Sequence, residues 1–309
     1  PPPPPPPFFF QAQDGIGDAQ ESRGLGDVYK RQPRNVSSQE LDLLSQIVEK
    51  RLGMDLNRRR QGRLLQMLEK RVKESGRKDL MDYLNFVDFS PDHPEWRYLE
   101  EILTIQKTEF FRESSQMTYL QEEILPEIKA KKSSQNQRKI RIWSCGCSTG
   151  EEAYSLSILI HEIFQPLSEW DIKILASDVH RQSLETARKG HYPEDSLKTV
   201  KDDWMKRYFQ ENHSDSENVY FVADILKQII HFRPINLMDK RYPVKTLFDI
   251  ILCRNLLIYM TALSQEQIIG RFRSLLEPGG YLLLGHSEYL PDRRDFQRNK
   301  FNVFQTPLN

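Results

Sequence analysis

The sequence predicts an α/β domain with a small inserted β-subdomain, preceded by an all-α domain. Two patterns lead to this prediction. From Ile140 onward, short apolar segments typical of strands alternate with helical segments, which favours a mostly parallel sheet with helices on both faces. Between residues 33 and 107, apolar residues recur at helical spacing throughout. We therefore expect a helical domain over 33–129, a linker over 130–139 and the α/β domain over 140–309.

The composition is compatible with a large protein in a reducing compartment. A chain of 309 residues can form one large or two ordinary domains, each with its own core. Lys plus Arg and Asp plus Glu both number 44, so the net charge does not indicate a nucleic-acid or membrane partner. No apolar run approaches the roughly 20 residues that a membrane span needs. Three cysteines without a secretory signal predict a reducing cytoplasm. Cys145-x-Cys147 has no second Cys or His cluster nearby, so we expect packing residues and no metal site.

Residues 1–32 differ from the rest of the chain. They begin with seven prolines and three phenylalanines and show neither helical nor strand periodicity. They also lack the basic and long apolar regions of a signal peptide. We expect this segment to be disordered. Because it resembles a translated cloning or sequencing scar, it does not enter the fold prediction.

Four helices are expected before residue 107. The first begins with a capping box of Ser37 and Glu40 and ends at Gly53. Its apolar face consists of Leu41, Leu44, Ile47, Val48 and Leu52. The other three are expected over 57–76, 80–89 and 96–105.

The second of these helices has a basic face. Four residues fall opposite its apolar stripe: Arg59, Arg63, Lys70 and Lys73. Charged stripes are usually solvated surface. However, acidic residues that could form i,i+4 salt bridges are nearly absent among these positions, which favours an acidic partner. Both interpretations stay open on spacing alone.

The segment Thr108-Glu-Phe-Phe-Arg112 is expected to open a helix that runs to about Ile128. The adjacent phenylalanines would anchor it, and Arg112 would lie one turn beyond Thr108 on the same side. The polar segment 130–139 is predicted to be structureless.

The α/β domain is expected to contain six strands, over 140–145, 172–177, 229–234, 248–253, 281–285 and, at the edge, 302–305. Between 193 and 232 the alternation is interrupted by a short helix near 204–209 and a strand at 219–222, which indicates the inserted subdomain. A helix over 264–276 should end in the turn Pro278-Gly279-Gly280. Ligand sites of such folds lie at the carboxyl ends of the strands. The candidate residues there are 144–150, Asp178, Asn236, Arg254, Asn255 and 286–288.

The loop after the first strand is typical of a ligand cradle. Gly146 and Gly150 allow backbone N–H groups to approach a bound molecule closely. The loop has neither the P-loop Lys-Ser/Thr pair nor a full G-x-G-x-x-G. The next helix opens with Glu151 and Glu152, which would repel a phosphate and attract an amine or hydroxyls. We therefore expect a cationic nucleoside, with its two ribose hydroxyls bound by Asp178.

Five motifs, in this order and spacing, resemble those of the CheR-type chemotaxis receptor methyltransferases, and the resemblance extends from Pro33 to Asn309. They are Thr108-Glu-Phe-Phe-Arg112, the segment 143–155 (WSCGCSTGEEAYS), Ala176-Ser-Asp178, the segment 248–259 (FDIILCRNLLIY) and Gly285-His-Ser-Glu288. The resemblance implies a Rossmann-like S-adenosylmethionine-dependent methyltransferase. It implies transfer of the methyl group to glutamate γ-carboxylates on the cytoplasmic helices of chemoreceptors, giving methyl esters and S-adenosylhomocysteine.

The resemblance also implies which residues bind the cofactor: Gln106, Thr108, Arg112, Glu152, Asp178, Asn236, Leu237, Arg254 and Asn255. Three positions depart from the usual pattern, with Gln106 in place of Asn, Lys107 in place of Glu and Ala153 in place of Pro. The amide of Gln106 should keep a shifted hydrogen bond. Loss of the proline should cost only a little preorganisation. We have no account of Lys107.

The chemistry expected from this family requires no general base, because a glutamate side chain is ionised at neutral pH. We expect Arg112 to bind the substrate carboxylate or that of the cofactor, and Tyr259 to line the methyl channel; a buried structural ring is the alternative for Tyr259. Glu152 would meet the cofactor's amino group. We expect His286 and Glu288 to form a structural hydrogen-bonded pair. The basic residues Arg59, Arg63, Lys70 and Lys73 would guide a glutamate-rich receptor helix.

Two other functions fit the same fold. The substrate could be a small carboxylic acid or a nucleic acid, although the balanced charge disfavours the latter. The chain could also be an adaptor that binds cofactor and receptor without turnover. The partners expected from the sequence are chemoreceptor helices, without nucleic acid or membrane insertion, and a monomer is the default.

Overall fold

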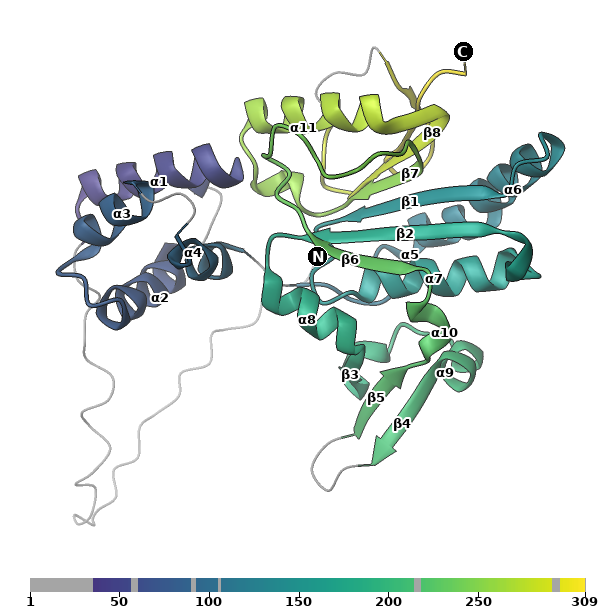
Figure 1. The fold of residues 1–309 in the computed structure, drawn as a ribbon, viewed down its shortest axis with the longest axis horizontal. Helices are drawn as coiled ribbons and strands as arrows, with labels where there is room; N and C mark the ends of the chain where they lie inside the picture. Colours follow the sequence, from purple (N-terminus) through teal and green to yellow (C-terminus); the bar gives the residue numbers. More distant parts are fainter. Residues whose placement is uncertain are drawn as a thin grey trace, which may run out of the picture. The chain divides into compact units, whose positions relative to one another are not determined.

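The computed structural model describes residues 36–56, 61–89, 93–104, 107–213, 218–290 and 295–308 (Figure 1). Residues 1–32 lie outside these ranges, so the prediction made for them stays untested.

The N-terminal region is helical, as predicted. Its first helix has the expected capping box, in which Ser37 and Glu40 exchange side-chain and backbone hydrogen bonds, and Gly53 ends it in the left-handed region at φ 67°. The helices bury a common apolar cluster that includes Leu44, Leu68, Leu84 and Leu99. Their bounds are α1 Ser38–Leu52, α2 Gln61–Glu74, α3 Leu80–Phe89 and α4 Glu95–Leu103.

The segment from Thr108 to Arg112 does not open a helix, so this prediction was wrong. Phe111 and Glu113 have positive φ angles of 49° and 57°, which a continuing right-handed helix cannot accommodate. The helix begins only at Ser114 and has three consecutive parts, which are α5 Ser114–Tyr119, the π-helical η2 Leu120–Ile124 and α6 Leu125–Ser134. The chain turns here because both phenylalanines are buried against aromatic residues of the following domain.

The predicted linker over 130–139 was also wrong for its first half, because α6 continues to Ser134. Its polar residues sit on a helix whose other side is buried through Leu125 and Ile128. The α5–α6 segment shares its apolar cluster with the sheet, whereas the buried residues of the N-terminal cluster run from Leu44 to Leu103, with Tyr259 packed against them. We therefore propose a domain boundary near residues 104–107 in place of 130–139.

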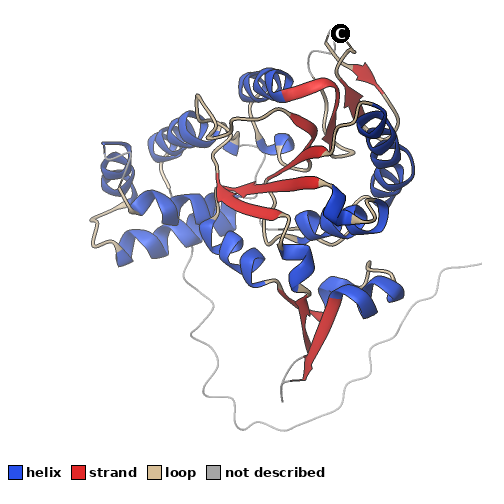
Figure 2. Cartoon of the chain, turned by 45° about the vertical axis from the view of Figure 1, so that its right-hand side comes forward, coloured by secondary structure: helices blue, strands red, loops and turns tan. Residues whose placement is uncertain are grey.

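A seven-stranded sheet forms the centre of the α/β domain, in the order β6-β2-β1-β7-β8-β10-β9 (Figures 1 and 2). The first five strands in this order are parallel, and β10 and β9 are antiparallel to their neighbours. All six expected strands are confirmed. The two-residue strand β9 is too short to leave a sequence pattern. The strands are β1 Lys139–Cys145, β2 Asp171–Asp178, β6 Ile230–Pro234, β7 Phe248–Cys253, β8 Leu276–Leu284, β9 Gln297–Arg298 and β10 Val303–Gln305.

One turn prediction in this domain was wrong. The residues Pro278, Gly279 and Gly280 lie within β8, which follows α11 directly, and do not form a turn before the strand. The irregularity they cause is a register shift between Phe248 and Ile250 of the neighbouring strand. The sheet therefore tolerates the proline at its irregular end.

Alternate residues of the strands pack against different helices, because successive side chains of a strand point to opposite faces. Ile142 and Leu252 belong to the cluster with α5, α6, α7 (Glu151–Ile163) and α8 (Arg181–Lys189). Trp143 and Ile251 belong to the cluster with α11 (Ala262–Leu275). The sheet is thus covered by helices on both faces (Figure 1).

The inserted β-subdomain is present as a second, three-stranded antiparallel sheet in the order β3-β5-β4. The expected helix and strand correspond to α9 and β5; β3 and β4 were not predicted. Its strands are β3 His191–Pro193, β4 Phe209–His213 and β5 Asn218–Val222, with α9 Asp202–Tyr208 and α10 Asp224–Lys227. Short 3₁₀ helices are η3 Leu167–Glu169, η4 Glu194–Leu197 and η5 Leu257–Tyr259.

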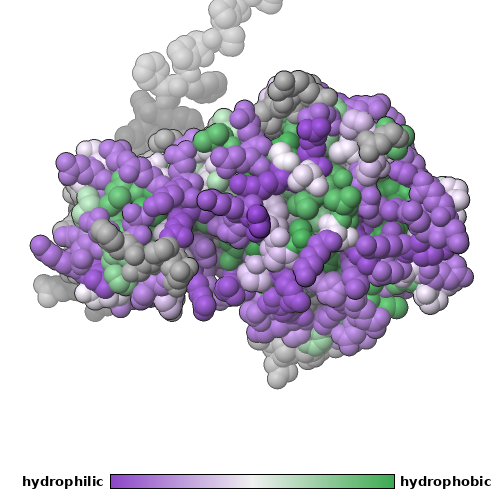
Figure 3. Space-filling view, turned by 45° about the horizontal axis from the view of Figure 1, so that its top comes forward, coloured by the Kyte–Doolittle hydropathy of each residue, from purple (hydrophilic) through white to green (hydrophobic). Residues whose placement is uncertain are grey.

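The surface is mainly hydrophilic on the face in Figure 3, with separate small hydrophobic areas. The large hydrophobic residues that are exposed come from different elements, for example Met67 on α2, Leu263 on α11 and Tyr289 after β8. Within the described ranges, no helix has both the length and the apolar character that crossing a membrane requires.

Glu100 on α4 gives the helical region a pH dependence. Burial and the nearby charge of Asp239 outweigh the attraction of Arg181 and Arg51, and the pKa of Glu100 rises from 4.5 to about 7. When folding raises the pKa of an acid, the protonated acid stabilises the folded state at pH values below the pKa of the unfolded chain. This stabilisation is lost as the pH rises through the pKa of the folded state. We expect the free energy of unfolding of Glu100→Gln to fall less than that of the wild type between about pH 4.5 and about pH 7. Urea denaturation at several pH values in this range measures the free energy of unfolding. If it falls equally with pH in Glu100→Gln and in the wild type, the prediction is contradicted.

Candidate functional site

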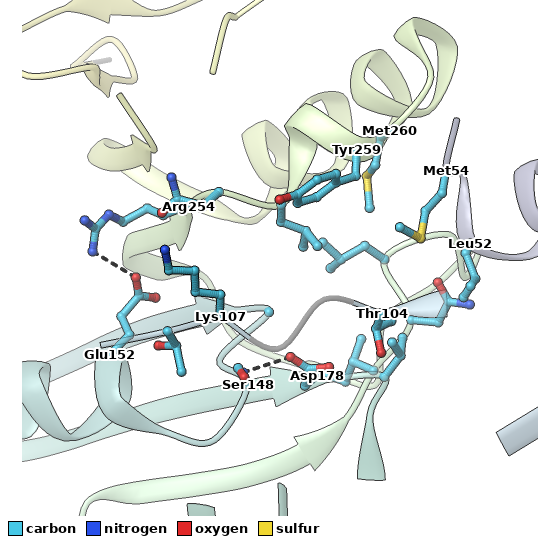
Figure 4. A pocket seen from close by; sticks show the side chains of 18 of the residues that line it. Leu52, Met54, Thr104, Lys107, Ser148, Glu152, Asp178, Arg254, Tyr259 and Met260 are labelled. Atoms are coloured by element: carbon cyan, nitrogen blue, oxygen red, sulfur yellow. Dashed lines mark hydrogen bonds and ion pairs between the residues drawn. The ribbon is translucent and has the colours of Figure 1, made fainter. Parts of the chain in front are cut away.

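A pocket opens at the carboxyl ends of β1, β2, β6 and β7 (Figure 4). Its empty volume, which includes space open to solvent, is about 950 Å³. The structure brings nine of the predicted site residues together in its wall: Thr108, Arg112, Glu152, Asp178, Asn236, Leu237, Arg254, Asn255 and Tyr259. Gln106 lies outside the described residues.

The loop after β1 forms the floor of the pocket. Gly146 has a φ of 69°, and a Cβ there would lie 3.0 Å from a methyl of Leu256. Gly150, at φ 100°, is the N-cap of α7, and a Cβ there would lie 2.8 Å from the Cβ of Ala187. Both positions therefore need glycine, and between them the backbone of Ser148 faces Asp178. The strand, loop and helix arrangement predicted for this segment is confirmed.

Asp178 ends β2 with its carboxylate held by two backbone amides. Ser148 N donates to its Oδ2 at 2.8 Å, and His180 N donates to its Oδ1 at 2.9 Å (Figure 4). Burial raises the pKa of Asp178, and these amides oppose the rise. Each carboxylate oxygen can accept a second hydrogen bond. The side chain can therefore accept two neighbouring hydroxyls while it stays anchored.

Glu152 and Arg254 form an ion pair at the opposite side of the pocket, with 3.0 Å between Oε2 and Nη1 (Figure 4). Ser144 donates a 2.7 Å hydrogen bond to the other oxygen of Glu152. Glu151 points elsewhere, because it is buried and accepts hydrogen bonds from Thr149. Of the two glutamates predicted to attract a cation, only Glu152 lines the pocket.

The Thr108–Arg112 motif reaches the pocket because its phenylalanines dock elsewhere. The Phe110 ring packs edge-on against Tyr192 and Phe209, and Phe111 stacks on Trp204 at 4.8 Å between centroids. This leaves Thr108 and Arg112 in the pocket wall. The Arg112 guanidinium donates to the carbonyl of Lys107 at 2.9 Å. Lys107, for which the sequence offered no account, lines the same wall through its side chain (Figure 4).

The remaining wall is mainly apolar and joins α1 to the sheet. Met54 pairs with Met260 in an isolated antiparallel bridge, and Asp55 N donates to the Tyr259 carbonyl at 2.8 Å. Asn236 donates to the carbonyl of Arg51 at 2.8 Å. The Tyr259 ring extends into the pocket near Met260 (Figure 4). This wall suits a flat, weakly polar ring such as a purine.

His286 and Glu288 do not form the structural pair that we expected. Glu288 is buried and accepts backbone hydrogen bonds from Gly285, Asn255 and Leu257 at 2.6–2.9 Å. His286 instead faces Glu113, with 3.8 Å between Nε2 and Oε2. The chain turns sharply after β7 and after β8, so backbone N–H groups there have no strand partner and bond to the nearest carboxylates. The partners of Glu288 are backbone amides, not His286.

The basic face of α2 is only partly as expected. Arg59 lies outside the described residues, as does the side chain of Arg63. Lys70 forms an i,i+4 salt bridge with Glu74 at 3.7 Å, so the assumption that such bridges are absent was wrong. This bridge joins two exposed side chains and contributes little to stability. Lys73 is exposed.

All three cysteines are buried and free, and burial raises their pKa values. They pack in the clusters on the two faces of the sheet. Over the described part of the chain, no group of three or more His, Cys, Asp or Glu side chains is placed to hold a metal ion.

Several residues of the site could not be read from the sequence. Leu52, Met54 and Met260 line the pocket through tertiary contacts that leave no local pattern. Glu113 does not line it but bonds to Arg254 and Asn255, which do. Its position directly after Arg112 was the one available signal.

Most of the α/β domain matches a known protein family. Residues 106–305 match the description "CheR methyltransferase, SAM binding domain". The chain belongs to the CheR methyltransferase family. It is 32% identical to the chemotaxis protein methyltransferase of Borreliella burgdorferi, over 85% of this chain and 92% of the relative. It is also 32% identical to the chemotaxis protein methyltransferase of Escherichia coli, over 79% and 82%.

The matched domain binds S-adenosylmethionine, and the chain is a methyltransferase. Among solved structures, a glycopeptide N-methyltransferase complexed with S-adenosylmethionine shares 11% identity over 51% of this chain and 48% of that chain, with a TM-score of 0.30.

The pocket fits this cofactor by its own chemistry. Within the described residues, Asn255 Oδ1 is buried without a hydrogen-bond partner, although Asn255 lines the pocket. Asp178 and Glu152 provide carboxylates on opposite sides of the pocket, and a carboxylate can accept hydrogen bonds from hydroxyls or from an amine. Met54 and Met260, joined by their backbone bridge, add an apolar part to the wall of the same pocket. A cationic nucleoside with an amino-acid tail satisfies all of these groups.

Proposed function

We propose that this protein is a cytoplasmic methyltransferase that esterifies glutamate γ-carboxylates on the cytoplasmic helices of chemoreceptors. The observation that carries the proposal is the single pocket in which Asp178, Glu152, Arg112 and Tyr259 meet. Relatives with the name chemotaxis protein methyltransferase, similar over most of this chain, support the substrate class.

We assign the cofactor groups by the chemistry of the wall. Asp178 accepts the ribose hydroxyls, and Asn236 and Leu237 adjoin the purine. Glu152, with its charge held by Arg254, binds the ammonium of the amino-acid tail. Gln106 and Thr108 complete the set that we expect from the family.

Bound S-adenosylmethionine supplies a methyl group on a positively charged sulfur. The protein then has to hold a glutamate oxygen in line with that methyl and exclude water, because the carboxylate is already ionised. Arg112 has the guanidinium geometry to hold a carboxylate in two hydrogen bonds. Tyr259 closes the channel beside it.

The proposal is tested by transfer of labelled methyl from S-adenosylmethionine to membranes that contain chemoreceptors, followed by mild alkali. A methyl ester releases its label as methanol. Alkali-stable label, or label on nucleic acid or a small acid, would contradict the proposal. Cofactor binding with no transfer would favour the adaptor.

Arg112→Ala is expected to lower kcat/KM for receptor by about 10- to 100-fold, the loss of a charge-assisted carboxylate contact. Arg112→Lys should recover part of it, because it restores the charge without the two-pronged geometry. The dissociation constant of S-adenosylhomocysteine then tells which carboxylate is bound: an unchanged value assigns Arg112 to the substrate. Arg298→Ala, an exposed arginine on β9, is the matched control. A kcat/KM within about twofold of wild type for Arg112→Ala would contradict a catalytic role.

We further propose that Arg59, Arg63, Lys70 and Lys73 guide the glutamate-rich receptor helix. Lys70 and Lys73 are exposed, so charge reversal there should not disturb the fold. The double variant Lys70→Glu/Lys73→Glu is expected to raise KM for receptor several-fold, more at low salt, and to leave cofactor affinity unchanged. Lys139→Glu, exposed at the other end of the sheet, is the control. An unchanged KM would contradict this proposal.

A further inference from the structure

Glu113 lies between the Thr108–Arg112 motif and α5 in an unusual backbone conformation. Its φ and ψ angles are 57° and 62°, in the left-handed region. Residues other than glycine adopt this conformation rarely, and they keep it where surrounding contacts hold them. The side chain is 13% exposed, so the contacts it makes are largely shielded from water.

The Glu113 carboxylate joins the ends of two strands. Its Oε2 accepts from Arg254 Nη2 at 3.1 Å. Its Oε1 accepts from Asn255 Nδ2 at 3.0 Å and from His286 N at 3.1 Å. Burial opposes ionisation, but the Asn255 and His286 hydrogen bonds and the charge of Arg254 outweigh it and lower the pKa of Glu113. The group is therefore a carboxylate that can only accept hydrogen bonds.

This property decides the orientation of the Asn255 amide. Because Glu113 can only accept, the NH₂ end of Asn255 has to face it, and Oδ1 is left over. That oxygen is buried and has no partner among the described residues. Asn255 lines the cofactor pocket, whereas Glu113 does not. A buried acceptor without a donor is costly unless a ligand supplies one.

We propose that Glu113 is a positioning residue for the cofactor: it holds the Asn255 side chain so that Oδ1 is presented as an acceptor to a donor group of the ligand. It acts through Asn255 and also holds Arg254 beside Glu152. The ligand offers N–H donors in its ammonium and its purine amino group. The proposal rests on the cofactor site described under Proposed function.

Glu113→Gln tests it with almost no change in size. The new NH₂ group has to face either Asn255 Nδ2 and His286 N or Arg254 Nη2, which are all donors, so Glu113→Gln releases either Asn255 or Arg254 from the position in which Glu113 holds it. We expect the dissociation constant of S-adenosylhomocysteine to rise about tenfold or more. Glu122→Gln, exposed on η2, is the matched control and should bind as the wild type does.

A second substitution separates positioning from simple packing. In Glu113→Gln/Asn255→Asp the carboxylate and the amide exchange places. Asp at 255 accepts from the new amide and still keeps an acceptor oxygen for the ligand. We expect the double variant to recover most of the lost affinity, whereas Asn255→Asp alone sets two carboxylates against each other and binds worse. Glu113→Asp, which keeps the charge but withdraws it by one methylene, should lie between wild type and Glu113→Gln.

Calorimetry measures these affinities, and thermal unfolding shows that each variant is folded. In the ligand-free protein, the NMR signals of the Asn255 side-chain amide should move in Glu113→Gln and stay in place in Glu122→Gln. A folded Glu113→Gln or Glu113→Asp with affinity within twofold of wild type would overturn the proposal, and so would a double variant as weak as Glu113→Gln. If Asp178→Ala binds S-adenosylhomocysteine as tightly as the wild type does, the cofactor site itself would be overturned instead.

Discussion

Asp178→Ala is expected to weaken the binding of S-adenosylhomocysteine by about 100-fold or more. Hydrogen bonds to a charged group contribute roughly 1.5–3 kcal/mol each, and two ribose hydroxyls would lose their acceptor. The substitution also frees Ser148 N and His180 N, which Asp178 holds at 2.8 and 2.9 Å. The loop that cradles the ligand should therefore become less ordered as well. Calorimetric titration measures the effect.

The matched control is Asp171→Asn, at the amino end of the same strand. Asp171 is exposed and pairs with Arg141, far along β2 from the pocket. Its affinity for S-adenosylhomocysteine should equal that of the wild type. Equal weakening by both substitutions would mean that damage to β2 causes the loss, and no weakening by Asp178→Ala would remove Asp178 from the site.

Arg254→Met is expected to lower the free energy of unfolding by about 3–5 kcal/mol, the range for breaking a buried ion pair by removing one partner. The Arg254 side chain is 1% exposed and lies between Glu113 and Glu152 at 3.1 and 3.0 Å. Without it, two carboxylates that are 13% exposed would remain close together without a countercharge. Urea denaturation measures the loss.

Arg273→Met provides the comparison, because Arg273 pairs with Asp295 at 2.7 Å with 55% and 38% of the side chains exposed. Such an exposed pair contributes at most about 1 kcal/mol. If Arg254→Met costs no more than Arg273→Met, the buried network does not stabilise the strand ends. The buried network of Arg254, Glu113 and Glu152 then cannot account for the affinity of the cofactor site.

The sheet and the composition of the pocket were predictable because both follow from local patterns. Apolar runs such as Phe248–Cys253 identify central strands, and the residue after each strand falls at the carboxyl edge. Asp178 and the neighbours Arg254 and Asn255 therefore reach one pocket although Asp178 is far from the other two in the chain. The assignment to a methyltransferase family came from the motifs, which composition and periodicity could not supply.

Other features depend on contacts that no local pattern records. The helix after Arg112 begins late because Phe110 and Phe111 are buried against residues about 80 to 100 positions further on. Met54 reaches the pocket through its bridge to Met260. Glu288 resembles a partner for His286 in sequence, but backbone amides at the turn after β7 compete for its carboxylate and bind it.

The measurement that tests the central claim most directly is tandem mass spectrometry of a purified chemoreceptor cytoplasmic fragment after incubation with S-adenosylmethionine and the wild-type protein. The account predicts a mass increase of one methylene unit per site on glutamate side chains, removed by mild alkali and absent with Asp178→Ala. Methyl groups on another residue type, or an unmodified receptor in the presence of a protein that binds the cofactor, would contradict it.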